Sequence, residues 1–358
     1  MRDPICQYFG TCAGCDTQHI EYSVQLQNKV KNIAAMLKIS HESVKVFQDK
    51  EFEYRNRMDF LFSQYCIGLR SKTNKVIGIE MCPISSSTVN KLLDEIRIFF
   101  LDINISRAIK YAVVRASKTS SIGFIINEDS KQRDEAFELI TQFCLRTSAD
   151  NVVVGYVPHL SEDSTSLKFK IVKGKEILEE EFLGKKFFYH SQAFFQNNSK
   201  MAEKMIGYVK EILHGKKGHL VDLYGGVGNF GLCMDFEKIT IIESHPLSVE
   251  CAKKNILVNN IKNAEAIALD AKKIDRIKIS RPLHVINDPP RTGMDLLAIK
   301  KLTNLKPDTI IYVSCNPLKF KKEFPKFAKE GYSIKSVAMF DLFPQTNHIE
   351  MVVEMERS

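Results

Sequence analysis

The residues best suited to chemistry lie in three short phrases in the second half of this sequence. Cys315 follows an apolar run and is flanked by Ser314, Asn316 and Pro317. A glycine-rich stretch covers residues 222–229, and a carboxylate closes the phrase Asn347–Glu350. A thiolate can attack an electron-poor carbon, a glycine-rich loop can hold a nucleotide-like cofactor, and a carboxylate can remove a proton. Brought together by a fold, these parts predict methyl transfer to carbon.

The glycine-rich stretch Val221–Phe230 follows a predicted strand, and we expect a helix after it. Glycine lets the backbone turn sharply and approach a ligand closely. Glu243 ends the next predicted strand, about 20 residues after Asp222, where an acid can accept both ribose hydroxyls. The stretch lacks the triphosphate pattern G-x-x-x-x-G-K-[ST], which leaves a dinucleotide or S-adenosylmethionine as ligand. A strand–helix turn without any ligand is the plainer alternative.

A second polar phrase, Asn287–Arg291, closes another predicted strand with the sequence Asn-Asp-Pro-Pro-Arg. Asp288 is thereby placed at the carboxyl edge of the sheet, where open α/β sheets bind ligands. The same residues would also serve as a simple polar turn. Enzymes that methylate exocyclic nitrogen usually have an aromatic residue where Arg291 stands, so the phrase argues against N-methylation. Arg291 could instead hold a phosphate or close the loop through an ion pair.

Four of the nine cysteines are placed as if to bind a metal group. Cys6, Cys12 and Cys15 have the spacing C-x5-C-x2-C, and Cys82 precedes a proline. The odd total and the lack of an export signal argue against a disulfide framework. Four thiolates fit either an iron–sulfur cluster or a zinc ion, and the residue types do not separate the two.

The pattern of apolar residues divides the chain into three parts. Residues 1–45 hold the clustered cysteines and a helix over Tyr22–Leu37, residues 46–182 mix short strands and helices as an α+β domain, and residues 183–358 alternate strands with helices. Such alternation predicts a Rossmann-like α/β domain with a parallel sheet covered on both faces. Two late strands are expected to form an antiparallel hairpin at one edge. The expected strands of the third part are Leu220–Tyr224, Ile239–Glu243, Leu283–Asn287, Thr309–Val313, Ser333–Met339 and Ile349–Val353.

The bulk composition indicates an ordinary globular protein. Hydrophobic residues make up 44% and charged residues 26% of the 358 residues, and the net charge is +8. A basic excess favours a polyanionic partner without saying which one. No apolar run is long enough to span a bilayer, so we expect a cytoplasmic protein without a membrane partner, and a monomer.

Five phrases of this chain together resemble the RNA (uracil-5)-methyltransferase family. The chain begins close to its first cysteine, without the oligonucleotide-binding barrel of many members. In this respect it is similar to a shorter branch, some of whose members modify 23S ribosomal RNA. The five phrases are Phe194–Asn197, Asp222–Asn229, Asp288–Arg291, Ser314–Pro317 and Phe343–Glu350.

The resemblance implies roles for particular residues. Cys315 would attack carbon 6 of uracil, Glu350 would remove the proton from carbon 5, and Asp288 would orient the base close to the cofactor. A buried structural cysteine and a solvated edge-strand charge are the plainer readings of Cys315 and Glu350. Asp270 would accept from the adenine amino group, or only cap a loop. The S-adenosylmethionine pocket would be lined by Gln196, Tyr224, Asn229, Glu243, Asp270 and Asp288.

The resemblance also favours a [4Fe-4S] cluster over zinc on Cys6, Cys12, Cys15 and Cys82. Its expected role is structural or RNA-positioning, because methyl transfer consumes no electrons. The segments Tyr54–Arg57 and Gly68–Arg70 carry arginines and an aromatic, which suit RNA contacts or a salt-bridged strand face equally. We expect 23S rRNA as substrate, with tRNA as the alternative, and a target base swung out of its stack.

Two other functions remain compatible with the sequence. The first is an iron–sulfur or zinc RNA-binding protein that has kept the fold without catalysis, for which Cys315 and Glu350 would have no use. The second is a Rossmann oxidoreductase that uses the cluster for electron transfer, in which Asp288 and Cys315 would have no role. Activity that survives Cys315→Ala would favour the first, and absorption changes with a nicotinamide cofactor would favour the second.

Overall fold

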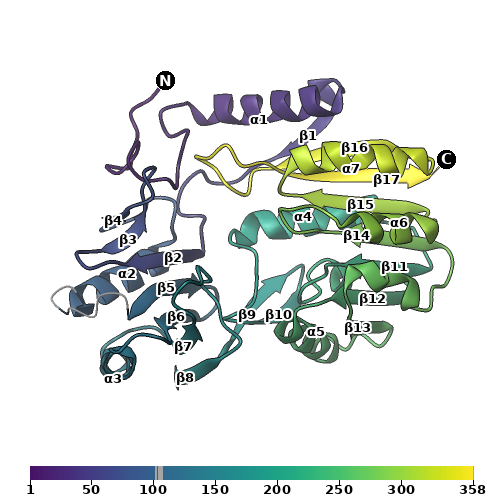
Figure 1. Ribbon diagram of the computed structural model, residues 1–358. Coiled ribbons are helices and arrows are strands. Elements are labelled where there is room, and N and C mark those ends of the chain that lie inside the picture. Colours follow the sequence, from purple (N-terminus) through teal and green to yellow (C-terminus); the bar gives the residue numbers. More distant parts are fainter. Residues whose placement is uncertain (101–102, 104–107, 358) are drawn as a thin grey trace.

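The computed structural model of the chain describes all residues except 101–102, 104–107 and 358. Two lobes lie side by side in Figure 1, each built on its own sheet. We call them the large-sheet lobe and the central lobe. No helix in the described part of the chain has the length and apolar character needed to cross a membrane.

The large-sheet lobe contains eight strands, most of them parallel. Strands such as β11 and β14 are buried at every position, as expected of central strands in a parallel sheet that is covered on both faces. This confirms the predicted Rossmann-like arrangement. In spatial order the strands are β1 (Val44–Phe47), β16 (Tyr332–Phe340), β17 (Glu350–Arg357), β15 (Thr309–Ser314), β14 (Leu283–Asn287), β11 (His219–Leu223), β12 (Lys238–Glu243) and β13 (Ala264–Ala268).

Helices cover both faces of this sheet and bury two separate cores (Figure 1). Met205 of α4 and Cys251 of α5 belong to one core, while Ala298 of α6 and Phe320 of α7 belong to the other. Leu26 of α1 joins the second core. The helices are α1 (Tyr22–Leu37), α4 (Ser199–Ile212), α5 (Pro246–Val258), α6 (Leu296–Asn304) and α7 (Pro317–Lys329), with 3-10 turns η1 (His41–Ser43), η2 (Gly231–Cys233) and η3 (Ala271–Arg276).

The central lobe contains a seven-stranded mixed sheet and two helices. Phe100, Phe124 and Phe143 pack edge to face or tilted within its core. A hairpin of β9 (Ile177–Phe182) and β10 (Lys185–His190) leads back to the large-sheet lobe. The elements are β4 (Val76–Gly78), β3 (Ile67–Arg70), β2 (Arg57–Phe62), β5 (Ile109–Ala116), β6 (Ser120–Asn127), β7 (Asn151–Val157), β8 (Phe169–Lys173), α2 (Ser87–Phe100) and α3 (Arg133–Cys144).

Two expectations about the large-sheet lobe are wrong in detail. The late hairpin does not form the edge of the sheet, because β1 pairs in parallel with β16 and occupies that edge. The glycine-rich loop is followed by the short turn η2 and not by a helix. Residues 231–234 are all buried, a pattern that leaves no polar face for a surface helix.

The expected domain limits fall within paired elements. The limit at 45–46 lies inside β1, and the limit at 182–183 lies between β9 and β10 of one hairpin. Helix α1 and strand β1 therefore belong spatially to the large sheet, although they precede the central lobe in the chain.

Candidate active site

The thiol of Cys315 and the carboxyl of Glu350 stand at the same end of two neighbouring strands. Ser314 of β15 is paired with Met351 of β17, so that Cys315 and Glu350 each lie one residue beyond this pair in the same direction. Cys315 is half-buried and Glu350 is buried. The two groups therefore lie at the same end of the sheet, as the predicted site requires.

Burial raises the pKa of both groups. The pKa of Cys315 is raised to about 11, first by burial and then by the nearby carboxyls of Glu350 and Asp288. The pKa of Glu350 is raised well above its ordinary value, again first by burial and then by Asp288. Arg291 opposes both shifts, because its positive charge favours a thiolate and a carboxylate alike.

Asp288 connects this pair to the glycine-rich loop. It follows β14 directly, and its backbone N–H donates to the carbonyl of Leu223 at 3.3 Å. Its pKa is raised to about 7, first by burial and then by the carboxyls of Asp222 and Glu243. The charge of Asp288 is thus coupled to Asp222 and Glu243, and Asp288 in turn raises the pKa of Cys315 and of Glu350.

A cavity of about 560 Å³ opens beside Cys315. Helix α1, the start of α7 and the phrase that precedes Glu350 form its walls. This cavity provides the space in which a flat ring could reach the thiol. Its lining residues are Asn32, Ala35, Met36, Arg291, Cys315, Asn316, Pro317, Leu318, Asn347, His348 and Ile349.

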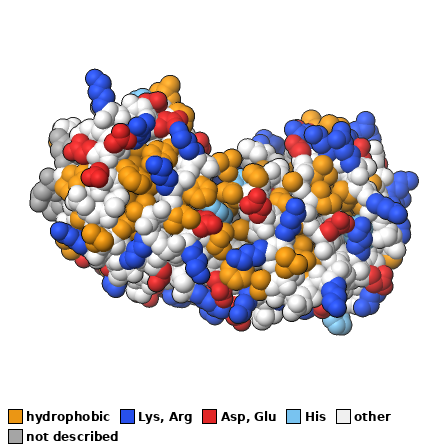
Figure 2. All heavy atoms as spheres, turned by 90° about the horizontal axis from the view of Figure 1, so that it is seen from below, with side chains coloured by type: hydrophobic (Ala, Val, Ile, Leu, Met, Phe, Trp, Pro, Cys, Tyr) orange, Lys and Arg blue, Asp and Glu red, His pale blue; other side chains and the backbone are white. Residues whose placement is uncertain are grey.

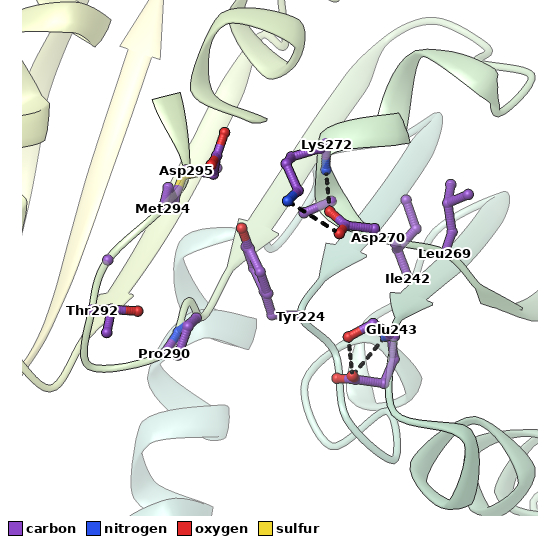
Figure 3. A pocket seen from close by; sticks show the side chains of 13 residues that line it. Tyr224, Ile242, Glu243, Leu269, Asp270, Lys272, Pro290, Thr292, Met294 and Asp295 are labelled. Carbon is purple, nitrogen blue, oxygen red and sulfur yellow. Dashed lines mark hydrogen bonds and ion pairs between the residues drawn. The ribbon is translucent and has the colours of Figure 1, made fainter. Parts of the chain in front are cut away.

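A second cavity, of about 400 Å³, lies at the carboxyl ends of β11, β12 and β13. Figure 3 shows Tyr224 on one side of it, Glu243 at the tip of β12, and Asp270 with Lys272 at the start of η3. Ligands of open α/β sheets bind at this edge. The structure therefore brings three of the predicted cofactor residues, Tyr224, Glu243 and Asp270, onto one cavity.

The glycine-rich loop owes its shape to residues with left-handed backbone angles. Tyr224 has φ +59°, Gly226 has φ +55° and Gly228 has φ +90°. A Cβ added to Gly228 would lie 2.7 Å from a methyl carbon of Ile241, so only glycine fits there. The turn lets the Gly226 N–H donate to the carboxylate of Glu243 at 3.1 Å.

Glu243 and Asp270 are already engaged by the backbone. Glu243 Oε1 accepts from the N–H groups of Ser244 and His245, each at 2.7 Å. Asp270 caps η3 by accepting from the N–H of Lys272 at 2.8 Å. Asp270 therefore caps the turn, as one reading expects, and also lines the cavity, while its contact with adenine stays a prediction.

Three predicted residues do not line the second cavity: Gln196, Asn229 and Asp288. Asn229 Oδ1 and Asp222 Oδ1 are buried without a hydrogen-bond partner among the described residues. Buried polar atoms of this kind normally have a hydrogen-bond partner, and a polar ligand bound at the loop would supply one. Lys272 and Met294 line the cavity and were not predicted; only their closeness to Asp270 and to the two prolines marks them in the sequence.

The four predicted metal ligands line one further cavity, of about 590 Å³, at the junction of the N-terminal segment with the central lobe. The pKa of Cys15 is raised to about 12, first by burial and also by Cys82, Cys12 and Cys6. In the described part of the chain, no group of three or more His, Cys, Asp or Glu side chains is arranged so that it could hold a metal ion.

The predicted RNA-contact segments are largely occupied by intramolecular bonds. Tyr54 is buried, and Arg57 forms a paired contact with Asp59, its Nε and Nη2 atoms donating at 2.8 and 2.9 Å. Arg70 is paired with Glu162 at 3.0 Å. Arg57 and Arg70 therefore form the ion pairs that the salt-bridged alternative expects, and their contact with RNA stays a prediction. Figure 2 shows lysine and arginine side chains spread over the face of both lobes, with acidic side chains among them.

Arg291 has a different environment. It lines both the cavity beside Cys315 and the cavity that holds the four thiols. Among the described residues no ion pair within 4.0 Å involves Arg291, so the loop is not closed by a salt bridge there.

The Rossmann-like fold and the cavity at the carboxyl ends of its strands are those expected of an S-adenosylmethionine-dependent methyltransferase, and comparison with known proteins supports this class. The crystal structure of Pyrococcus abyssi tRNA (uracil-54, C5)-methyltransferase in complex with S-adenosyl-L-homocysteine is similar, with a TM-score of 0.78 and 26% identity, covering 96% of this chain and 86% of that chain. A family model, tRNA (Uracil-5-)-methyltransferase, matches residues 21–358. The chain therefore belongs to the RNA uracil-5-methyltransferase family, as the resemblance predicted.

Relatives of known sequence agree with this assignment. An RNA methyltransferase of Caldanaerobacter subterraneus, itself uncharacterized, is 31% identical over 99% of this chain and 84% of its own length. The tRNA (uracil(54)-C(5))-methyltransferase of Pyrococcus furiosus is 30% identical over 98% of this chain and 85% of its own length. The predicted enzyme class, an RNA (uracil-C5)-methyltransferase, is confirmed.

Proposed function

We propose that this chain methylates carbon 5 of a uridine in tRNA, at the position that corresponds to uridine 54. The observation that carries the chemistry is the placement of Cys315 and Glu350 together beyond the last pair of β15 and β17, with Asp288 beside them. The tRNA substrate is supported by the tRNA methyltransferases of two Pyrococcus species. The expected preference for 23S rRNA has no such support.

The chemistry begins with the thiolate of Cys315, which forms a bond to carbon 6 of uracil and leaves an enolate with electron density at carbon 5. S-Adenosylmethionine supplies the methyl cation to that carbon. Glu350 then removes the remaining proton from carbon 5, the double bond between carbons 5 and 6 returns, and the bond between carbon 6 and sulfur breaks. The thiolate is regenerated, and 5-methyluridine leaves the site.

The electrostatics of the site fit these roles. Carboxyls raise the pKa of Cys315, and the positive charge of Arg291 opposes them. The carboxylate form of Glu350 must accept the proton, and a carboxylate whose pKa is raised, as that of Glu350 is by burial, is the stronger base. Asp288 is placed to accept from, or donate to, the polar edge of the base according to its own protonation, since its pKa is raised to about 7.

We also propose that Cys6, Cys12, Cys15 and Cys82 hold a [4Fe-4S] cluster. All four line one cavity, and their number and sulfur chemistry fit a cluster with four thiolate ligands. Because the described side chains are not arranged as the ligands of a metal ion, the proposal rests on the shared cavity and on the cysteine pattern of the sequence. The group would tie the N-terminal segment to the turn at Cys82.

The test is methyl transfer from labelled S-adenosylmethionine to unmodified tRNA and, separately, to 23S rRNA, with nucleoside analysis of each product. We expect 5-methyluridine in tRNA, and its loss when uridine 54 is replaced by cytidine. 5-Methyluridine in 23S rRNA alone would show that 23S rRNA, and not tRNA, is the substrate. If anaerobically prepared protein makes 5-methyluridine in neither RNA, the proposed function is wrong.

A further inference from the structure

The loop over residues 341–349 joins β16 to β17 and leads directly to Glu350. Four consecutive backbone carbonyls of this loop each accept a hydrogen bond from a different segment of the chain. Such a set of bonds fixes the path of a loop that has no regular structure of its own. The bonds run from Asn198 Nδ2 to Leu342 O (3.2 Å), Lys29 Nζ to Phe343 O (3.2 Å), Tyr54 OH to Pro344 O (3.0 Å), and the N–H groups of Asp16 and Thr17 to Gln345 O (3.0 and 3.1 Å).

The strongest of these donors is the buried ammonium of Lys29. It forms an ion pair of 2.7 Å with Asp341, and the two side chains are only 5% and 0% exposed. The other carboxylate oxygen of Asp341 accepts from the hydroxyl of Tyr22 at 2.9 Å. Helix α1 therefore holds the start of the loop through a fully buried polar contact, for which a charged pair needs well-placed partners.

The middle of the loop is held in a backbone conformation that L residues rarely adopt. Gln345 has φ +69°, and its N–H donates to Gln25 Oε1 at 3.2 Å. Its side-chain amide donates to Glu51 at 2.9 Å. A left-handed residue other than glycine persists where its surroundings determine it, and these bonds supply that determination.

Two of the donors are neighbours of residues that line the thiol cavity. Asp16 directly follows Cys15, while Tyr54 stands beside the turn that carries Cys82, since the Glu53 N–H donates to the carbonyl of Pro83 at 2.9 Å. Both sides of the thiol cavity are thus bonded to the loop that presents Glu350.

We propose that the thiol-bearing segment and α1 serve to position the general base, with Tyr54 and Lys29 as positioning residues for Glu350. This inference rests on the proposed function, in which Glu350 removes the proton from carbon 5. Cys315 follows β15, which is held by pairing with β14 and β17 and takes no part in these bonds. A loosened loop should therefore slow the last proton transfer more than the attack of the thiolate, so that methylated uracil stays bound to sulfur.

Tyr54→Phe tests the proposal with the loss of one hydroxyl. The matched control is Tyr332→Phe, because Tyr332 is also buried and its hydroxyl donates to the carbonyl of Pro307 at 2.8 Å, far from the loop. We expect Tyr54→Phe to release 5-methyluridine about tenfold more slowly and to accumulate a methyl-labelled, denaturant-stable protein–RNA adduct. Tyr332→Phe should do neither.

Amide hydrogen exchange in residues 341–350 provides a reading that does not depend on activity. We expect faster exchange there in Tyr54→Phe than in Tyr332→Phe. Equal amide exchange in the two variants would overturn the inference. So would an equal fall in the rate of 5-methyluridine release in both variants without a protein–RNA adduct, and Tyr54 would then be a purely structural residue. Failure of the unaltered protein to methylate any RNA would refute the proposed function, while the exchange comparison would still decide whether the loop is held as described.

Discussion

Cys315 and Glu350 stand one residue beyond the same strand pair, because Ser314 and Met351 face each other at the end of β15 and β17. The antiparallel register thus places the proposed nucleophile and the proposed base at the same end of the sheet. Both strands lie inside the sheet, β15 between β14 and β17, and β17 between β15 and β16. Glu350 is the first residue of β17 and directly follows the loop at 341–349.

Replacing Cys315 by alanine should abolish both 5-methyluridine formation and the covalent adduct, because among the described residues no other cysteine directly follows a strand of the large sheet. The measurement is gel mobility of the protein under denaturing conditions after incubation with labelled RNA. Cys144→Ala is the matched control, since Cys144 is also half-buried and its pKa is also raised to about 11. An adduct that survives in Cys315→Ala would assign the attack to another residue.

The reactivity of Cys315 should rise with pH. Its pKa is raised to about 11, so the thiolate is the minor form at neutral pH and its fraction grows about tenfold per pH unit up to that value. We expect the rate of alkylation by iodoacetamide to follow this slope between pH 7 and 10. Glu350→Gln removes a carboxyl that raises the pKa, so its alkylation profile should move to lower pH; a shift to higher pH would contradict the proximity of the two groups.

Glu243→Gln should weaken the binding of S-adenosylhomocysteine by about tenfold, because one carboxylate oxygen that accepts backbone N–H bonds becomes an NH₂ group. Equilibrium dialysis or calorimetry would measure the change. Glu265→Gln, in the neighbouring strand β13, is the control, since its carboxylate accepts from Thr240 and does not line the cofactor cavity. Equal affinities of the two variants for S-adenosylhomocysteine would show that a residue other than Glu243 binds the ribose.

The buried pair of Lys29 and Asp341 should affect stability strongly and unequally. Lys29→Met leaves an uncompensated buried carboxylate and should lower the free energy of unfolding by about 3–5 kcal/mol. Adding Asp341→Asn to this variant should restore part of the loss, because no buried charge then remains. Urea denaturation of the two proteins measures both values, and a double variant less stable than the single one would show that the charge is not the cause.

Cys15→Ser should lose the proposed metal group. Anaerobically purified protein is expected to contain about four irons and four sulfides per chain, and the variant to contain fewer. Cys66→Ser serves as the control, because Cys66 lies in a different cavity, beside Ser63. One zinc and no iron in the unaltered protein would reverse the assignment.

The elements that the sequence predicted well are those whose own residues carry the signal. Helix α1 spans Tyr22–Leu37 and β14 spans Leu283–Asn287, as expected, since an amphipathic stripe and a short apolar run each specify their element locally. The motif residues Tyr224, Glu243 and Asp270 meet on one cavity because the carboxyl ends of parallel strands share one edge.

Features that depend on distant partners could not be predicted. Strand β1 pairs with β16, and the residue types at 44–47 do not indicate which strand they will pair with. Tyr54 was expected near an RNA-contact surface but is buried, because its hydroxyl meets the carbonyl of Pro344. Lys29 resembles any solvent-facing lysine of a helix until Asp341 is placed opposite it. Pairings between residues far apart in the chain become visible only once the fold is known.

The strand order gives β17 a further significance during synthesis. It lies between β15 and β16, although both of these precede it in the chain. While the protein is being made, β15 and β16 each present an open edge until residues 350–357 emerge, and open edges invite pairing with other chains. The same strand carries Glu350, so a nascent chain lacks the proposed general base until residues 350–357 have been made. Assembly of this enzyme should consequently depend on protection of the open sheet late in translation.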